Sequence, residues 1–392
     1  MKSMESGKEL INIWDDLKIE FNKRKNVAIF GAGVVGKMCL DTLRPYNLVN
    51  FFIDNSTEKQ GTLMNDIPIV SLNDYLQKSK GWIIIACASP INQDIRKQLI
   101  KKNMKEKKDF WLMEDFYREV MPILSYYNYN KVFVNVCQIC LTERCTLKCK
   151  YCAHGCNKVA MNSEDMSLEK IKKSADSFFN VVDWVNEFVL IGGEPFLSQS
   201  LLDSIDYIGR NYRDKINIFS ITTNGTILPL DTIVEKCKTY NVTIRVSDYS
   251  RSIPRLKEKY EDFYKKLSEL NVLVWKTQDN SWVDYGFGKV DNGDDEEKLT
   301  QIFDSCLTDC REINGNKYYF CVMARSINDN YKINVGNMDY FSMENIKDKT
   351  LFVEYNYGFS EKGYLEMCRY CRGIDAKNYP IPAAEQDANA IL

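Results

Sequence analysis

Short apolar runs alternate with glycine turns and helical patterns over residues 1–125. Three of these runs read as buried strands: VAIF from Val27, FFIDN from Phe51 and WIIIACA from Trp82. Helices are expected from the glycine turn to Leu43 and over residues 92–102. Because strands separated by helices pair in parallel, the pattern predicts a Rossmann-like α/β domain. The aromatic run SYYNYN over residues 125–130 is expected to be a connector.

A second series of strands and helices follows over residues 126–295. Strands are predicted over residues 132–139, 188–191, 216–221, 242–246 and 272–275, and a helix with Ser167 as its N-cap. This rhythm is typical of a complete or partial (β/α) barrel. The acidic stretch DNGDDEEK from Asp291 predicts a boundary loop. Residues 296–392 are short, strand-like and cysteine-bearing, and we expect a small α+β extension there.

Fourteen cysteines against one histidine are the unusual feature of the composition. No apolar run approaches the ~18 residues of a membrane span, and the N-terminus lacks the pattern of a signal peptide. We therefore expect a cytoplasmic protein without a membrane span, in which cysteines serve as metal ligands rather than disulfides. A net charge of −2 does not favour nucleic acid as a partner. The scarcity of histidine disfavours zinc hydrolase sites and catalytic triads.

The sequence CTLKCKYC places thiols at Cys145, Cys149 and Cys152, directly after a predicted strand. Three thiolates on one loop can bind three irons of a cubane and leave the fourth iron open. The alternative is a structural zinc knuckle, which needs a fourth ligand. Three candidates for that ligand lie nearby: Cys140, His154 and Cys156.

This loop resembles that of the radical S-adenosylmethionine (SAM) superfamily. The resemblance implies that Cys145, Cys149 and Cys152 hold a 4Fe-4S cluster whose open iron is chelated by SAM. It also implies that Tyr151 meets the adenine. The family's mechanism is reductive cleavage of SAM to a 5'-deoxyadenosyl radical, with an electron from a flavodoxin or ferredoxin-type reductant.

Two further motifs extend the resemblance to the ends of later strands. In GGEP, the backbone of Gly192 and Gly193 and the carboxylate of Glu194 are implied to bind the SAM amino group. TTNG and RVS occupy positions where relatives contact the ribose and carboxylate of SAM. The residues implied there are Thr222, Asn224, Arg245 and Ser247.

Five cysteines follow the barrel: Cys306, Cys310, Cys321, Cys368 and Cys371. They resemble the twitch extension, a shortened SPASM domain that holds one auxiliary 4Fe-4S cluster. Because Cys310 stands close to the expected turn at Gly315, we take the other four as ligands. Cys310 would then be a free thiol that could donate a hydrogen atom, with a structural cysteine or an alternative ligand as the open alternatives. A zinc ribbon on the same thiols is a further alternative.

The N-terminal turn GAGVVG contains Gly31, Gly33 and Gly36 in a G-x-G-x-x-G pattern, and Asp54 ends the following strand. This context indicates a nucleotide or nucleotide-sugar site, with a redox role for NAD less favoured. The region resembles Rossmann-like domains of bacterial sugar-modifying and polysaccharide-assembly proteins. A docking domain without a ligand is the alternative.

Together these features predict a radical SAM enzyme that epimerises or oxidises a carbon of a sugar or nucleotide sugar. The first alternative is a radical SAM peptide maturase, since twitch and SPASM proteins commonly modify peptides. The second is an iron–sulfur electron carrier without catalysis. GGEP and TTNG speak against the carrier, because it has no use for a SAM pocket.

Overall fold

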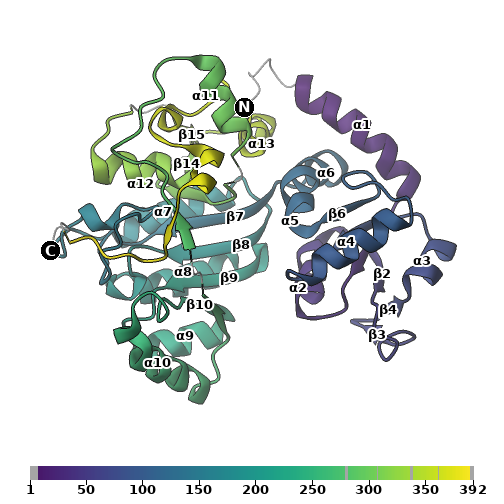
Figure 1. Cartoon of the computed structure of the whole chain (residues 1–392), viewed down its shortest axis with the longest axis horizontal. Helices are drawn as coiled ribbons and strands as arrows, with labels where there is room; N and C mark the ends of the chain where they lie inside the picture. The colour runs from purple at the N-terminus through teal and green to yellow at the C-terminus, as the bar shows by residue number, and fades with distance from the viewer. Residues whose placement is uncertain (1–7, 279–280, 307, 336–338, 361, 389–392) are drawn as a thin grey trace. The chain divides into compact units, whose positions relative to one another are not determined.

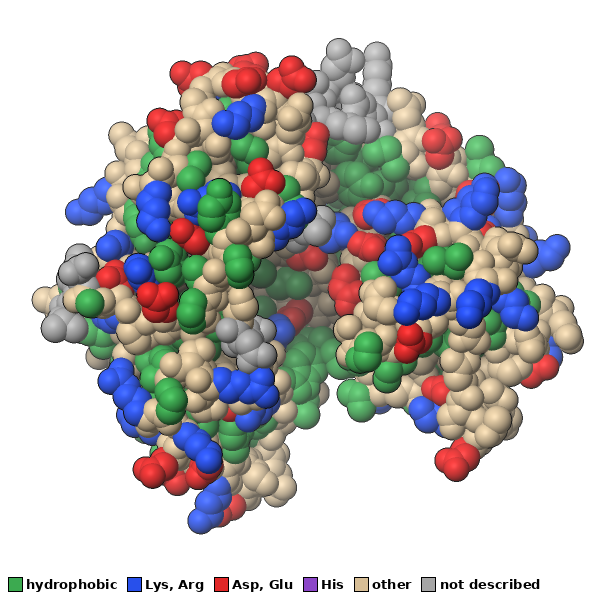
Figure 2. Space-filling model, in the orientation of Figure 1, with side chains coloured by type: hydrophobic (Ala, Val, Ile, Leu, Met, Phe, Trp, Pro, Cys, Tyr) green, Lys and Arg blue, Asp and Glu red, His purple; other side chains and the backbone are tan. Residues whose placement is uncertain are grey.

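The computed structural model describes residues 8–278, 281–306, 308–335, 339–360 and 362–388. The chain forms two compact α/β units that meet in sequence between Phe133 and Val134 (Figure 1). Lys and Arg side chains are interspersed with Asp and Glu on the face drawn in Figure 2, as 52 basic and 54 acidic residues would suggest. Among the described residues, no helix has the length and apolar character to cross a membrane.

The N-terminal unit is built on a six-stranded sheet of order β3-β4-β2-β1-β5-β6. Its strands are β1 Val27–Phe30, β2 Val49–Ile53, β3 Leu63–Met64, β4 Ile67–Val70, β5 Trp82–Ile85 and β6 Phe110–Leu112. All neighbours pair in parallel except β3 and β4. The helices are α1 Lys8–Arg24, α2 Val34–Leu43, α3 Leu72–Lys78, α4 Ile91–Lys101, α5 Met113–Asp115 and α6 Met121–Tyr129. The predicted parallel α/β organisation is confirmed.

The aromatic run expected to be a connector is mostly helical, so that prediction was wrong. Residues 125–129 form the second half of α6, which ends only where Asn130 adopts a left-handed conformation with φ +52°. The first half of α6 is fully buried, and Ser125 hydrogen-bonds Tyr46 at 2.8 Å. Tertiary packing therefore stabilises a helix where the aromatic pattern alone suggested irregular chain.

The second unit contains an eight-stranded sheet of order β11-β10-β9-β8-β7-β13-β14-β15. Its barrel-type strands are β7 Phe133–Cys140, β8 Trp184–Ile191, β9 Ile216–Thr223, β10 Val242–Ser247 and β11 Val274–Thr277. Each of the five overlaps a predicted strand. The helices between them are α7 Leu168–Phe179, α8 Leu201–Tyr212, α9 Asp231–Thr239 and α10 Lys257–Glu269. Ser167 caps α7 as predicted, because its side chain accepts a hydrogen bond from the Lys170 amide at 3.3 Å.

The C-terminal segment continues the barrel sheet. The hairpin of β13 Arg311–Asn314 and β14 Lys317–Tyr319 turns at Gly315, and β13 pairs in parallel with β7. The other elements are α11 Glu296–Asp304, α12 Val322–Tyr331, α13 Lys349–Tyr357, β12 Ser281–Val283, β15 Tyr340–Ser342 and β16 Pro380–Pro382. Asp295 caps α11, so the last residues of the expected boundary loop are already helical. Glutamates in a first turn favour this start.

Short 3-10 helices and one π-helix complete the chain. They are η1 Arg44–Tyr46, η2 Phe116–Val120 (the π-helix), η3 Cys156–Lys158, η4 Pro195–Leu197, η5 Arg213–Lys215, η6 Pro254–Leu256, η7 Glu366–Tyr370 and η8 Gly373–Asn378.

Candidate active site

The three-cysteine loop, residues 145–152, follows β7 at the carboxyl end of the strand. Cys145 and Cys149 are each 7% exposed, and Cys152 is half-buried. Burial raises the pKa of Cys145 to about 12. Burial also raises the pKa of Cys149, and the neighbouring Cys152 and Cys145 thiolates raise it further. Buried thiols crowded in this way ionise when cations neutralise them, and this donor set fits three irons of a cubane.

Hydrogen-bond donors already point at two of these sulfurs. The Leu147 amide lies 3.4 Å from the Sγ of Cys145, and Nδ2 of Asn224 lies 3.5 Å from the same atom. Nε2 of Gln386 lies 3.5 Å from the Sγ of Cys149. N–H donors stabilise thiolates, so the surroundings of the loop suit anionic sulfur ligands.

The two glycines of GGEP allow a close approach between backbone segments, and their contact with SAM stays a prediction. A Cβ on Gly192 would lie 2.5 Å from the carbonyl oxygen of Thr142, and one on Gly193 would lie 2.4 Å from that of Arg144. The Gly193 amide donates to the Thr142 carbonyl at 2.8 Å. The glycines therefore let the end of β8 pack directly against the backbone that leads into the three-cysteine loop.

Glu194 is fully buried, and its carboxylate faces protein donors. The hydroxyl of Thr223 contacts both oxygens at 2.8 and 2.9 Å, and the amides of Asn224 and Phe196 donate at 2.9 and 3.1 Å. Burial raises the pKa of Glu194 to about 7. In the structure, Glu194 ties the ends of β8 and β9 together, and its contact with the SAM amino group stays a prediction.

The structure places Asn224 at the three-cysteine loop, where it also donates to Thr146 Oγ1 at 3.1 Å. Thr222 lies opposite Arg245 in the β9–β10 pairing, and the carbonyl of Ser247 accepts from the Tyr260 hydroxyl at 3.1 Å. Tyr151 lies between two cations: the ammonium groups of Lys150 and Lys289 are 5.1 and 5.0 Å from its ring centroid.

Arg245 is paired with a carboxylate that the sequence analysis did not single out. Its Nη1 lies 2.7 and 2.8 Å from the two oxygens of Glu187, which is 7% exposed. Ser220 donates to the same carboxylate at 2.7 Å. Glu187, Ser220 and Arg245 come from the adjacent strands β8, β9 and β10. A glutamate inside the apolar run WVNEFVLI was the available indication of this buried pair.

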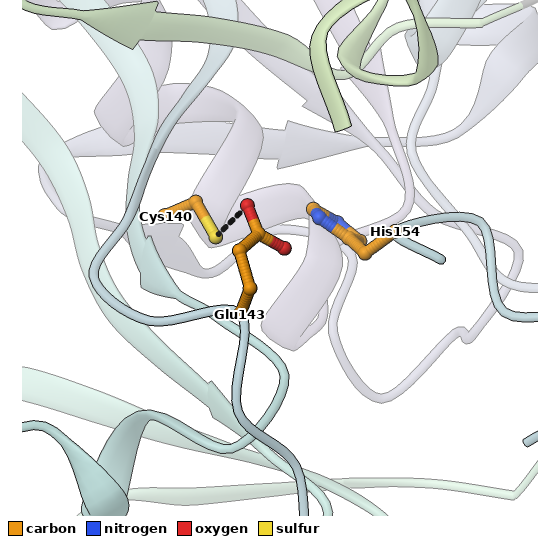
Figure 3. Close-up of side chains that lie close together, drawn as sticks. All are labelled: Cys140, Glu143 and His154. Atoms are coloured by element: carbon orange, nitrogen blue, oxygen red, sulfur yellow. Dashed lines mark hydrogen bonds between the residues drawn. The ribbon is translucent and has the colours of Figure 1, made fainter. Parts of the chain in front are cut away.

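Cys140, Glu143 and His154 bring potential ligand atoms within 4.8 Å of one another (Figure 3). A guanidinium already compensates this group, because Nη1 of Arg325 lies 2.7 Å from Oε1 of Glu143. Cys140 donates to the same oxygen at 3.4 Å. Glu143 of this group is therefore part of an ion-pair network.

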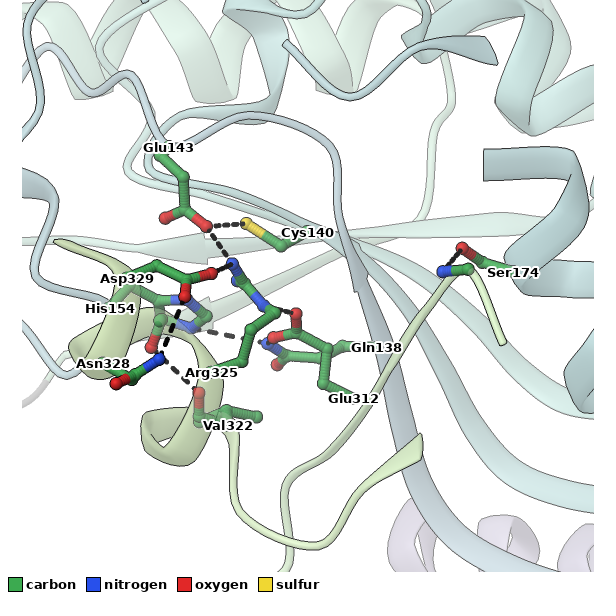
Figure 4. A network of polar contacts seen from close by, with 12 residues as sticks. Gln138, Cys140, Glu143, His154, Ser174, Glu312, Val322, Arg325, Asn328 and Asp329 are labelled. Carbon is green, nitrogen blue, oxygen red and sulfur yellow. Dashed lines mark hydrogen bonds and ion pairs between the residues drawn. The ribbon is translucent and has the colours of Figure 1, made fainter. Parts of the chain in front are cut away.

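Arg325 links this network to the C-terminal segment. Its guanidinium also forms an ion pair with Glu312 of β13 (Figure 4), and Glu312 is fully buried. Further along α12, Asn330 donates to the Glu143 carboxylate at 3.2 Å and to the His154 carbonyl at 2.7 Å. The helix α12 thus holds both sides of the three-cysteine loop.

Four of the five C-terminal cysteines line one cavity of about 260 Å³, the four-cysteine cavity. They are Cys306, Cys321, Cys368 and Cys371, the four predicted auxiliary ligands. Cys321 directly precedes α12, and Asn292 donates to the carbonyls of Cys368 and Cys371 at 2.9 Å each. Burial raises the pKa of Cys371 to about 12. This thiol, too, ionises more readily beside a bound cation.

Cys310 does not line the four-cysteine cavity. The residue is exposed, yet protein atoms desolvate its thiol and raise the pKa. The charges of Arg311, Asp309, Glu187 and Arg245 also act on this pKa. The thiol is therefore protonated at neutral pH, near the Glu187–Arg245 pair of the barrel sheet.

In the N-terminal unit, the glycine turn leads from β1 into α2, and the carboxylate of Asp54 is held by protein donors. A Cβ on Gly36 would lie 1.8 Å from the Gly31 carbonyl oxygen, whereas one on Gly33 would meet open space. Asp54 accepts from the Ala32 and Ser56 amides at 2.9 Å each, and Lys59 lies 3.1 Å from the same carboxylate. The nucleotide contact of Asp54 stays a prediction, and in the structure its carboxylate is held by these donors.

Two family models match the chain. The Radical SAM superfamily model covers residues 139–274, which include the three-cysteine loop, GGEP and the ends of β9 and β10. Residues 139–274 therefore belong to the radical SAM superfamily. A second model, described as C2185-like, N-terminal, matches residues 23–110.

Curated relatives match short segments of the radical SAM enzyme. GTP 3',8-cyclase of Erythrobacter litoralis (strain HTCC2594) is 30% identical over 95 residues, 24% of this chain and 28% of the cyclase. The antilisterial bacteriocin subtilosin biosynthesis protein AlbA of Bacillus subtilis (strain 168) is 31% identical over 106 residues, 27% of this chain and 22% of AlbA. The matches thus span less than a third of either relative.

Solved structures show weaker likeness. Streptococcus suis SuiB bound to S-adenosylmethionine aligns with 17% identity and a TM-score of 0.30, over 56% of this chain and 49% of SuiB. Native anSMEcpe with bound AdoMet and Cp18Cys peptide aligns with 14% identity and a TM-score of 0.34, over 66% of this chain and 92% of that one. TM-scores of this size support no conclusion about substrate.

Proposed function

We propose that this radical SAM enzyme carries an auxiliary 4Fe-4S cluster in the four-cysteine cavity and modifies a peptide. The observation that carries the proposal is the convergence of Cys306, Cys321, Cys368 and Cys371 on one cavity. Four thiols complete the ligand set of a cubane without an open iron. A cluster of this kind can exchange electrons with a bound substrate or a reductant, while the three-cysteine loop starts the reaction.

Cys145, Cys149 and Cys152 would hold a 4Fe-4S cluster with SAM. One-electron reduction would cleave SAM to methionine and a 5'-deoxyadenosyl radical, which would take a hydrogen atom from the substrate. The chain's own residues arrange this chemistry. Asn224 and Gln386 direct N–H groups at the cluster sulfurs. Glu194 fixes the strand ends beside the loop. The Glu187–Arg245 pair gives the barrel face a charged group that can orient a polar substrate.

Two observations favour a peptide over a sugar. The relative AlbA is named for the biosynthesis of a bacteriocin, which is a peptide product. In addition, Asp54 is occupied by Lys59 and two amides, which weakens the case for nucleotide-sugar binding in the N-terminal unit. A nucleotide or sugar substrate is the second candidate, because the cyclase relatives are named for GTP.

Anaerobic turnover assays distinguish the two candidates. The reconstituted enzyme is incubated with SAM, a reductant and either peptides encoded by short reading frames beside its gene or a panel of nucleotide sugars. We expect a peptide to increase 5'-deoxyadenosine formation and to change in mass. Conversion of a nucleotide sugar, with every peptide unchanged, would contradict the proposal.

The same assay in heavy water tests the role of Cys310 as a hydrogen-atom donor. A donor thiol exchanges with solvent, so an epimerised product should carry deuterium at the inverted carbon. Cys310→Ala should then abolish the labelled product while SAM cleavage persists. An oxidised product without solvent label, unaffected by Cys310→Ala, would assign electron transfer to the auxiliary cluster and leave Cys310 structural.

A further inference from the structure

The last described segment of the chain returns to the three-cysteine loop. Residues 383–387, the C-terminal strap, form strand-like backbone contacts with it: the Lys150 amide donates to the Glu385 carbonyl at 2.7 Å, and the Asp387 amide donates to the Lys148 carbonyl at 2.6 Å. In Figure 1 the yellow C-terminal segment runs back to the teal loops that follow β7. Ala383 and Ala384, which begin the strap, are fully buried.

The side chain of Gln386 has one orientation that satisfies its surroundings. Its Oε1 accepts from the Lys148 amide at 3.0 Å, and a backbone N–H can only donate. Nε2 therefore faces the other way, where it donates to the Ala384 carbonyl at 2.7 Å and lies 3.5 Å from the Sγ of Cys149. Because two contacts other than the sulfur fix the amide, an N–H group is aimed at Cys149.

The strap is also anchored beyond the loop. Asn157 donates to the Asp387 carboxylate at 2.8 Å, and Lys158 lies 3.6 Å from the same carboxylate. Both residues belong to η3, which follows the three-cysteine loop. The strap therefore spans from the middle of the loop to its exit. The side chain of Gln386 can turn away from Cys149 only by giving up its contacts with the Lys148 amide and the Ala384 carbonyl.

We propose that Gln386 is a positioning residue of the SAM cluster. Gln386 holds Cys149 in place and raises the reduction potential of the cluster by donating a hydrogen bond to the sulfur of this ligand. This inference rests on the cluster assignment of the proposed function. Reduction adds negative charge that is shared by the ligand sulfurs, and an N–H donor stabilises this charge. The cluster of a radical SAM enzyme must accept an electron, so the strap makes the first step easier.

The test is a redox titration of the full-length, reconstituted enzyme, followed by electron paramagnetic resonance. The SAM cluster is identified as the signal that changes on addition of SAM. Gln386→Met keeps the length of the side chain but removes the donor. We expect it to shift the reduction equilibrium about tenfold toward the oxidised cluster, ~59 mV for one electron. Gln386→Glu, which keeps an acceptor for the Lys148 amide but adds negative charge, should shift it further.

Glu385→Gln is the matched control, because it changes a strap side chain that contacts the exposed Lys150, 3.4 Å away, and leaves Gln386 in place. It should titrate as the unmodified enzyme does. If Gln386→Met loses the SAM cluster, Gln386→Glu decides: a lower potential supports the proposal, and an unchanged potential overturns it. Unchanged potentials in both variants overturn it as well. If the unmodified enzyme shows no signal that responds to SAM, the proposed function fails first.

Discussion

The three-cysteine loop and the four-cysteine cavity lie in the same unit but are assembled in different ways. The loop draws its thiols from eight consecutive residues, and backbone and amide donors from GGEP, Asn224 and the strap surround it. The cavity draws its thiols from three separate segments, and apolar side chains such as Ile302, Met323 and Leu365 line much of the rest.

This difference teaches how each site depends on the fold. The covalent chain fixes the spacing of Cys145, Cys149 and Cys152, so tertiary structure has to supply only their surroundings. In the cavity, tertiary structure has to supply the ligand set itself, because Cys306 and Cys371 meet only when α11, α12 and η7 converge. We therefore expect the three-cysteine loop to be most sensitive to loss of a cysteine. The four-cysteine cavity should also be sensitive to loss of the contacts that bring its segments together.

The largest expected effect comes from the loop. Cys149→Ala removes one of three iron ligands, and we expect 5'-deoxyadenosine formation to fall by more than about 100-fold, beyond what loss of an outer-shell partner costs. Iron content measured after anaerobic reconstitution should fall by about half, since a second cubane remains. Retention of SAM cleavage in this variant would contradict the role of the three-cysteine loop in this comparison.

A smaller effect is expected when the cavity loses two ligands. The Cys368→Ala, Cys371→Ala double variant should fall from about eight irons to about four, while SAM cleavage without substrate persists. Replacement of Cys237, a buried cysteine of α9 outside both sites, by Ala provides the control and should leave the iron count unchanged. Zinc in place of half the iron in the unmodified protein would show that the cavity is a zinc site.

Replacement of Arg325 tests whether the three-cysteine loop and the four-cysteine cavity depend on the same helix, α12. Arg325→Met leaves the buried Glu312 and the partly exposed Glu143 without their cation, and we expect a loss of about 3–5 kcal/mol in the free energy of unfolding. Because α12 directly follows Cys321 and contacts Glu143 through Arg325, iron should fall at both sites. Adding Glu312→Gln should recover part of the stability in thermal melts. Iron lost from one site alone would show that the sites are held independently.

The smallest expected effect is on the pH dependence of stability and comes from Glu194, which lies beside the three-cysteine loop. Burial raises its pKa from 4.5 to about 7, so the folded apo-protein holds a proton more tightly than the unfolded chain does. The stability from this proton is fully present below pH 4.5 and is lost as the pH rises through about 7, up to about 3 kcal/mol. Glu194→Gln should flatten unfolding free energy between pH 5 and pH 8, roughly the range of this titration. Glu235→Gln, which alters an exposed residue, should leave the slope unchanged.

Sequence by itself determined the elements and the local sets of ligands. Strands β1, β2, β5 and β7 to β11, the Ser167 cap, the Gly315 turn and the three-cysteine spacing each depend on residues close together in the chain, where periodicity and turn chemistry act directly. The family resemblance, carried by the same short motifs, is confirmed by the match over residues 139–274.

Only the tertiary structure decided which side chains face each other across long separations. Gln386 is 237 residues from Cys149, and Arg325 lies far from Glu143, so no local pattern marks these pairs. The periodicity of hydrophobic residues indicates which face of a helix or strand is buried. The partner of a polar group, in contrast, depends on the packing of the whole unit.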